Sequence, residues 1–261
     1  MWACATCLHS NPLSHTIRPF IHPPLRRLLA SPARRSSSSM DNEAVVASPA
    51  DLLFKAPLEV VKYPDPILRA KNKRVNMFDE SLKKLVYEMF DVMYRECEKL
   101  VGFLFHRTDG IGLSAPQVGI NVELMVFNLV GERGEGEEIV LINPRIKRYS
   151  SKIVPFNEGC LSFPGIYGDV QRPDALQVDA QDIAGASFEV NLTGLSARVF
   201  QHEYDHLQGI LFIDRMSDEV LDGIRAELQA LEKKYEETTG LPSPETIDAR
   251  RKKKAVGFGK S

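Results

Sequence analysis

Long apolar runs are absent from this sequence, and cysteine is scarce. No stretch of the 261 residues approaches the roughly 18 consecutive apolar residues that a membrane-spanning helix needs. Of the four cysteines, Cys4 and Cys7 lie close to the start of the chain. The other two, Cys97 and Cys160, are too few to form a disulfide framework. We therefore expect a protein that does not span a membrane and that folds in a reducing compartment.

Acidic residues are missing from the first forty positions. This segment holds five arginines, five prolines, no lysine and a run of four serines at 36–39. An acid-free, arginine-bearing and serine-rich leader is typical of an organelle transit peptide, whereas a secretory signal needs a compact apolar core. Plain disorder is the alternative, because disordered segments share this composition. We expect residues 1–56 to be a transit peptide followed by a linker.

The rest of the chain is mildly acidic. Residues 41–261 hold 28 basic and 35 acidic residues, a formal charge of −7. This balance argues against direct nucleic-acid binding, which depends on lysine and arginine neutralising phosphates. Positive charge gathers again only at residues 250–254, near the end of a polar tail. We expect residues 241–261 to be disordered, with docking onto an acidic or RNA-rich partner such as the ribosome as the alternative.

The spacing of apolar residues predicts an α+β domain over residues 57–240. Helical spacing begins after Asp79 and continues to Tyr94, and two further helices are predicted at 196–207 and 218–237. Between the first two helices lie short β-prone runs separated by Gly, Pro and Asp, at 122–130, 139–142, 152–156, 175–180 and 188–192. We expect mostly antiparallel strands packed around a central metal-binding helix, with one core helix before it and one after it.

The segment His202-Glu203-Tyr204-Asp205-His206 carries the strongest chemical signal. Residues four apart on a helix lie on one face, so both imidazoles can reach one ion with Glu203 beside it. A bound metal lowers the pKa of its water towards 7, and a neighbouring carboxylate can take the proton and return it to a leaving group. Outside the leader the chain has only one other histidine, His106, so a purely structural role for this pair is a poor explanation.

A catalytic metal needs a third protein ligand and an open coordination position. One protease clan places a histidine six residues after the second one, but here that position is Phe212. Another clan uses a downstream glutamate, for which Glu227 is a candidate. Cys160 is the remaining candidate, although a lone cysteine is more often a small buried apolar residue. Its position between Gly159 and Gly165 favours an exposed functional turn.

Three segments together resemble the signature motifs of peptide deformylases. They are residues 110–117 (GIGLSAPQ), 158–162 (EGCLS) and 201–206 (QHEYDH), which occur in the order found in that family. The resemblance covers roughly residues 57–237 and is closest to the organellar deformylases of plants. This resemblance agrees with the transit-peptide composition of the first forty residues. We therefore expect the protein in the chloroplast stroma, with the mitochondrion as a second destination.

The resemblance implies a reaction and a metal site. Peptide deformylases are hydrolases that remove the formyl group from the N-terminal formyl-methionine of nascent polypeptides. The resemblance makes Cys160 the third ligand of one divalent ion, Fe(II) or Zn(II), beside His202 and His206. It makes Glu203 the general acid and base that assists attack by a metal-bound water.

The resemblance also implies how the substrate is held. The side-chain amide of Gln117 and the backbone N–H of Leu161 are expected to stabilise the oxyanion. The substrate backbone is expected to pair with two short stretches, which are Ile111 with Gly112 and Glu158 with Gly159. Leu195 and Val199, which precede His202 on the same helix, are candidates for the methionine pocket. Apolar residues at this spacing often serve helix packing instead. Tyr167 is expected near the path of the peptide.

One segment departs from the family pattern. Residues 96–107 form an insertion between the first helix and the first motif, and several of them are apolar. It either lengthens the helix or covers the cleft, and a small displacement of the neighbouring motif would impair catalysis. An inactive or weakly active member of the family is therefore one alternative to an active deformylase. The other alternative is a different HExxH metallopeptidase, which would use another third ligand.

Overall fold

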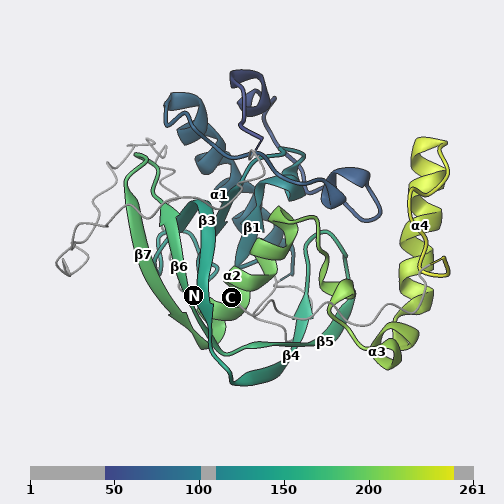
Figure 1. The fold of residues 1–261 in the computed structure, drawn as a ribbon. Coiled ribbons are helices and arrows are strands. Elements are labelled where there is room, and N and C mark those ends of the chain that lie inside the picture. Colours follow the sequence, from purple (N-terminus) through teal and green to yellow (C-terminus); the bar gives the residue numbers. More distant parts are fainter. Residues whose placement is uncertain (1–44, 101–109, 250–261) are drawn as a thin grey trace, which may run out of the picture. The chain divides into compact units, whose positions relative to one another are not determined.

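The computed structural model describes residues 45–100 and 110–249, all of which belong to the unit Asn42–Ser261 (Figure 1). Within these residues, none of the helices is both long and apolar enough to cross a membrane. The elements, with 3-10 helices written η, are in chain order η1 Pro49–Leu52, η2 Pro66–Arg69, α1 Glu80–Leu100, β1 Gly112–Ser114, η3 Ala115–Val118, β2 Leu124–Phe127, β3 Ile139–Tyr149, β4 Ile153–Gly159, β5 Tyr167–Pro173, β6 Ala175–Gln181, β7 Ser187–Thr193, α2 Gly194–Leu207, η4 Phe212–Asp214, α3 Asp218–Gly223 and α4 Arg225–Thr239.

The strands form two antiparallel sheets. The larger has five strands in the order β1-β2-β3-β6-β7, and the smaller consists of β4 and β5. Strand β1 therefore lies at an edge of its sheet, and both β4 and β5 keep one edge without a strand neighbour. The predicted α+β class with mostly antiparallel strands is confirmed.

Helix α1 begins and packs as its sequence predicts. The carboxylate of Asp79 accepts hydrogen bonds from the backbone N–H groups of Ser81 and Leu82, which caps the first turn. The apolar face of the helix enters the main core, with Leu82, Leu85, Val86, Met89, Phe90 and Met93 all buried. The helix extends to Leu100, so the first part of the predicted insertion lengthens it, while residues 101–109 lie outside the described ones.

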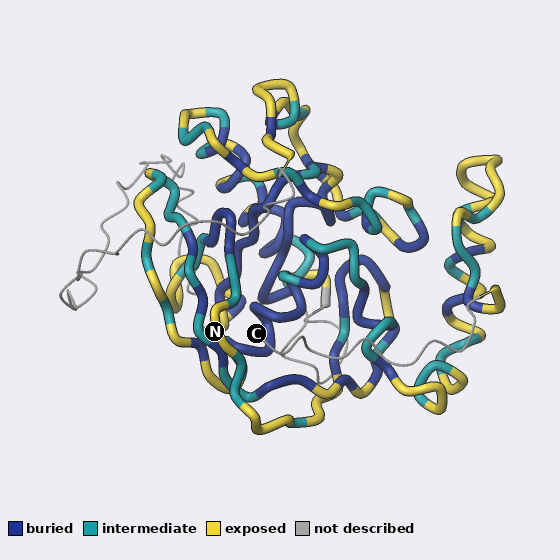
Figure 2. Tube along the Cα trace, viewed as in Figure 1, coloured by how far each residue is buried: buried dark blue, intermediate teal, exposed yellow. Residues whose placement is uncertain are grey.

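Helix α2 is the central helix of the domain, and the mostly dark tube in Figure 2 shows that it is buried beyond its first turn. It packs against β1, β2 and β7 of the large sheet and against β5 of the small one. Beyond its C-terminal end, Gly209 adopts φ +69° next to Arg69, where a Cβ would lie 2.4 Å from the Arg69 carbonyl oxygen. Only glycine fits this turn without a shift of the backbone.

The C-terminal part differs from the prediction in two ways. The single helix predicted at 218–237 is wrong, because the chain breaks at Ile224 (φ −112°, ψ 11°) into α3 and α4. The first part of the predicted disordered tail, residues 241–249, packs onto the domain. Ile247 is 3% exposed, and its N–H donates to the carboxylate of Glu232. The basic run 250–254 lies outside the described residues.

The N-terminal boundary differs as well. The predicted linker is part of the packed domain from about residue 45 onward, since Ala47 and Leu52 are 5% and 2% exposed and belong to the main core. The ammonium of Lys73 forms an ion pair of 2.6 Å with Asp51 in the same segment. Residues 1–44, which include the predicted transit peptide, lie outside the described ones.

Candidate active site

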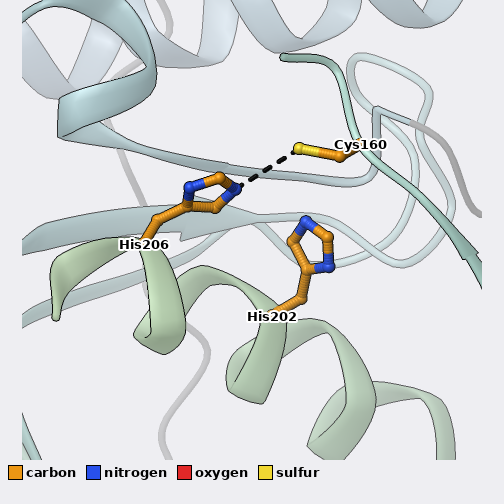
Figure 3. Close-up of side chains that lie close together, drawn as sticks. All are labelled: Cys160, His202 and His206. Atoms are coloured by element: carbon orange, nitrogen blue, oxygen red, sulfur yellow. Dashed lines mark hydrogen bonds between the residues drawn. The ribbon is translucent and has the colours of Figure 1, made fainter. Parts of the chain in front are cut away.

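Three potential metal ligands converge at the centre of the domain. His202 and His206 project from successive turns of α2, and Cys160 follows the end of β4, as Figure 3 shows. All three are buried, and one ligand atom from each lies within 4.8 Å of the others. Cys160 Sγ and His206 Nε2 lie 3.3 Å apart. Tetrahedral donors around one zinc-sized ion lie roughly 3.3–3.7 Å apart, so one thiolate and two imidazoles fit such an ion.

A buried carboxylate orients His202. Glu158 Oε2 lies 3.0 Å from His202 Nδ1, which leaves Nε2 of the imidazole for the ion. Glu158 in turn accepts two bonds from the Arg172 guanidinium, at 2.7 and 2.9 Å, and one of 2.9 Å from Arg198. Burial by itself would raise the pKa of Glu158, but Arg172 and the hydrogen bond with His202 hold it well below its usual range. Glu158 is therefore a charged partner that fixes the ligand geometry.

Arg172 also holds Asp205, near the C-terminal end of the segment 202–206 on α2. Arg172 is fully buried and forms a 2.6 Å ion pair with Asp205, which is paired with Arg215 at 2.6 Å. Two buried carboxylates, Glu158 and Asp205, are thus bridged by one guanidinium between β4, β5 and α2. A buried charge network of this kind holds its members in place only while all of them are paired.

Glu203 is a buried carboxyl beside the three ligands. It faces Gly112, where a Cβ would lie 2.8 Å from Glu203 Oε1 and 2.7 Å from a methyl carbon of Val199, so any larger residue here would displace one of these side chains. Burial raises the pKa of Glu203 to about 7, although the charge on His202 lowers it. Within the described residues Glu203 Oε2 has no hydrogen-bond partner. A carboxyl with a pKa near neutrality can both take up and release a proton.

Two hydrogen-bond donors lie next to Cys160. Gln117 Oε1 accepts bonds from the backbone N–H and the hydroxyl of Ser114, both at 2.8 Å, so the amide NH₂ must point the other way. Gln117 Nε2 lies 3.5 Å from Cys160 Sγ. The second donor is the N–H of Leu161, next in the chain to Cys160, for which the described residues offer no acceptor.

These groups share one cleft with an empty volume of about 450 Å³. Its lining includes most of the predicted site residues and two that the sequence did not single out, Phe156 and Arg198. The lining residues are Gly110, Ile111, Gly112, Gln117, Phe156, Glu158, Gly159, Cys160, Leu161, Leu195, Arg198, Val199, His202 and Glu203. Arg198 lies four residues before His202, so helical spacing could have indicated it; Phe156 had no comparable signal.

Two predicted residues do not line this cleft. His206 lies behind the other ligands and is almost fully buried. Tyr167 pairs with Gly159 across the small sheet and lines a neighbouring hollow that shares only Cys160 and Leu161 with the cleft. Leu195 and Val199 line the cleft and also pack in the adjoining core.

Comparison with known proteins agrees with this geometry. Residues 57–221 match the model of the polypeptide deformylase family. The chloroplastic peptide deformylase 1B of Solanum lycopersicum is 65% identical over 230 residues, which are 88% of this chain and 78% of that protein. The chloroplastic/mitochondrial peptide deformylase 1B of Arabidopsis thaliana is 58% identical over 258 residues, 98% of this chain and 85% of that protein.

Solved structures show the same relationship. The crystal structure of a plant peptide deformylase, PDF1B, is similar with a TM-score of 0.69 and 65% identity, covering 74% of this chain and 98% of that one. A peptide deformylase from Plasmodium falciparum is similar with a TM-score of 0.63 and 42% identity, covering 69% of this chain and 98% of that one. The chain belongs to the polypeptide deformylase family.

Proposed function

We propose a division of roles among the cleft residues of this organellar-type deformylase, an amide hydrolase that acts on the formylated N-terminus of nascent polypeptides. The observation that carries the proposal is the cluster of three metal ligands beside a cleft that two of them, Cys160 and His202, line together with a buried carboxyl and two hydrogen-bond donors. A metallopeptidase with another third ligand is not favoured, because Cys160 supplies the third donor atom beside the two histidines.

The metal is proposed to be Fe(II) or Zn(II), held by Cys160, His202 and His206. When bound there, such an ion would polarise the formyl carbonyl and make water more acidic. Thiolate and imidazole ligands suit several divalent ions, so the donor set by itself does not choose between the two.

Glu203 is proposed to move the proton. It takes one proton from the attacking water and delivers it to the amide nitrogen as the C–N bond breaks, which yields formate and a free N-terminal amine. The pKa of about 7 that burial gives this carboxyl suits both steps. The bound ion would lower that pKa and favour the proton-accepting form.

Gln117 and the N–H of Leu161 are proposed to stabilise the negative charge that develops on the formyl oxygen. Both donors are fixed before the substrate arrives, Gln117 by Ser114 and Leu161 by its place after Cys160. Donors held in this way cost no reorganisation during reaction, and removing one such donor typically costs about 3–4 kcal/mol of transition-state stabilisation.

The peptide is proposed to bind as an added strand. The cleft lies between two sheet edges, since its walls include residues 110–112 at the start of the edge strand β1 and Phe156, Glu158 and Gly159 of β4. An extended peptide between them can pair on both sides, with Ile111 and Gly112 opposite Glu158 and Gly159. The methionine side chain would then point towards α2 and meet Leu195 and Val199.

The leader and the tail are proposed to govern where the protein works. Relatives named as chloroplastic and mitochondrial support an organellar location, and we propose the chloroplast stroma, with the mitochondrion as a second destination. We also propose that the transit peptide lies within residues 1–44 and that the basic run 250–254 contacts the organellar ribosome. Unchanged co-sedimentation with ribosomes after deletion of residues 250–261 would refute the latter.

A direct test compares the purified, metal-loaded protein with Glu203→Gln on a formyl-Met tripeptide. We expect turnover by the first and a loss of at least about a hundredfold in the second, because general acid–base catalysis contributes about 10²–10⁴-fold. Metal content should be equal in both. A folded, metal-loaded protein without turnover would instead favour the inactive alternative and direct attention to residues 96–107.

A further inference from the structure

Three consecutive residues connect the two proposed oxyanion donors. The N–H of Val61 donates to the carbonyl oxygen of Gln117 at 2.7 Å. The N–H of Tyr63 donates to the carbonyl oxygen of Ser162 at 2.9 Å. Between them, the Lys62 ammonium donates to the carbonyl oxygen of Leu161 at 2.8 Å. Residues 61–63 thus hold the backbone of both donors from one side, although none of them belongs to the three sequence motifs.

The loop after Cys160 shows what these bonds achieve. The carbonyl of Cys160 accepts from the N–H of Phe163 at 2.8 Å, so each of three successive carbonyls, from Cys160 to Ser162, has a fixed partner. The N–H of Leu161 has none among the described residues. The carbonyls of Cys160 and Leu161 flank this N–H along the backbone. Because both carbonyls are held, the direction of the Leu161 N–H is fixed and the group stays available to the substrate. Lys62 supplies the only one of these bonds that comes from a side chain.

Lys62 also brings a positive charge to this position. It lines the hollow beside Cys160 and Leu161. The two other charged side chains of this hollow, Glu96 and Lys99, form an ion pair with each other. Burial lowers the pKa of the Lys62 ammonium, while Glu96 and Cys160 raise it. A cation near the site where the formyl oxygen gains negative charge favours the transition state over the neutral substrate.

We propose that Lys62 is a positioning residue for the oxyanion site, which holds the Leu161 carbonyl so that the Leu161 N–H stays directed at the formyl oxygen. The inference rests on the proposed role of that N–H. It predicts an effect on the chemical step rather than on substrate binding. The Lys62 bond supports the contact of the Leu161 N–H with the formyl oxygen, and this contact strengthens only as negative charge develops on that oxygen.

The first test uses three variants of the full chain, each metal-loaded: Lys62→Met, Lys62→Arg and, as a matched control, Lys147→Met. Lys147 lies on β3, pairs with Asp179 and Glu189, and lines neither hollow. For formyl-Met-Ala-Ser we expect kcat to fall on the order of tenfold in Lys62→Met, with KM changed by less than about twofold. Lys62→Arg should recover most of the loss, and the control should match the parent protein.

The second test separates positioning from general structural support. Affinity is measured for a hydroxamate analogue of the substrate, whose carbonyl oxygen takes the place of the formyl oxygen, and for the product Met-Ala-Ser, which lacks that oxygen. Lys62→Met should weaken the hydroxamate by about fivefold or more and leave the product within about twofold. An equal loss for both ligands, or an unchanged kcat in a folded Lys62→Met protein, would overturn the inference while parent turnover upholds the proposed function. A parent protein without turnover would overturn both.

Discussion

At the residue scale, the buried carboxyl of Glu203 links the site to stability. Burial raises its pKa to about 7 in the folded protein, above the usual value of 4.5. The unfolded chain therefore releases this proton at lower pH than the folded chain does. In the metal-free protein the group is neutral in both states below pH 4.5, and its contribution to stability declines as pH rises from 4.5 through 7.

We predict that Glu203→Gln removes this pH dependence. In chelator-treated protein, the free energy of unfolding of the variant should rise relative to that of the parent between pH 5 and pH 7.5, because glutamine has no charge to bury. Urea denaturation at the two pH values measures the difference. Because the other titrating groups are common to both proteins, they cancel to first order. A difference that does not change with pH would show that the carboxyl does not titrate in this range.

A second residue-scale prediction concerns Arg172. Replacing it with Met leaves Glu158 and Asp205 buried without their shared guanidinium, so the free energy of unfolding should fall by about 3–5 kcal/mol. Lys152→Met is the control, since its ion pair with Asp174 is exposed and worth at most about 1 kcal/mol. Chemical denaturation measures the free energy of unfolding of both variants. Equal losses would mean that burial of the ion pair does not determine how much stability its removal costs.

At the scale of elements, the spacing of the apolar residues predicted the long helices but missed two of the strands, β1 and β5. Seven apolar residues between Leu82 and Tyr94 recur at helical spacing over a stretch long enough to define a helix, and α1 follows it. Strand β1 has three residues and β5 contains Gly, Asp and Pro, so neither shows an alternating pattern. The break between α3 and α4 falls next to Gly223, which weakens a helix without specifying where it ends.

Helix α2 offers a matched pair of glycines for a test of what holds it in place. Gly194 at its start and Gly209 beyond its end both have positive φ, but only Gly209 has backbone atoms where a Cβ would lie. We predict that Gly194→Ala costs about 1–2 kcal/mol of stability from backbone strain. Gly209→Ala should cost roughly 1–3 kcal/mol more, because the methyl group displaces the backbone of Arg69.

The measurement is the free energy of unfolding of both variants, with deformylation assayed beside it. Gly209→Ala should also lose activity, since the shift acts on the end of the helix that carries His206. Equal costs at the two glycines would contradict the clash with Arg69 and leave strain as the common cause.

At the scale of the whole molecule, the sequence indicated the reacting groups and could not indicate the groups that hold them. Two ligands and Glu203 lie within five residues of one helix, so spacing alone brings them together. Arg172 and Lys62 reach the site through tertiary contacts between distant segments, and nothing in their local sequence marks them. Their partners depend on sheet pairing and on the path of the chain before α1.

The extent of the folded domain gives the last prediction. The family match begins at residue 57, yet the chain packs into the core from Ala47 onward, with Leu52 2% exposed. A protein that begins at residue 45 should keep the melting temperature of the full chain. One that begins at residue 57 loses the burial of Leu52, worth about 1.5–3 kcal/mol, and the ion pair of Asp51 with Lys73.

For a domain of this size the shorter protein should melt roughly 4–12 °C lower, since each kcal/mol shifts the midpoint by about 2–4 °C. Its deformylase activity at low temperature should persist, because no residue of 45–56 lines the cleft. Leu52→Ala in the longer protein is the control and should reproduce part of the loss. If the two truncated proteins melted together, residues 45–56 would contribute nothing to stability, and the domain would begin where the family match does.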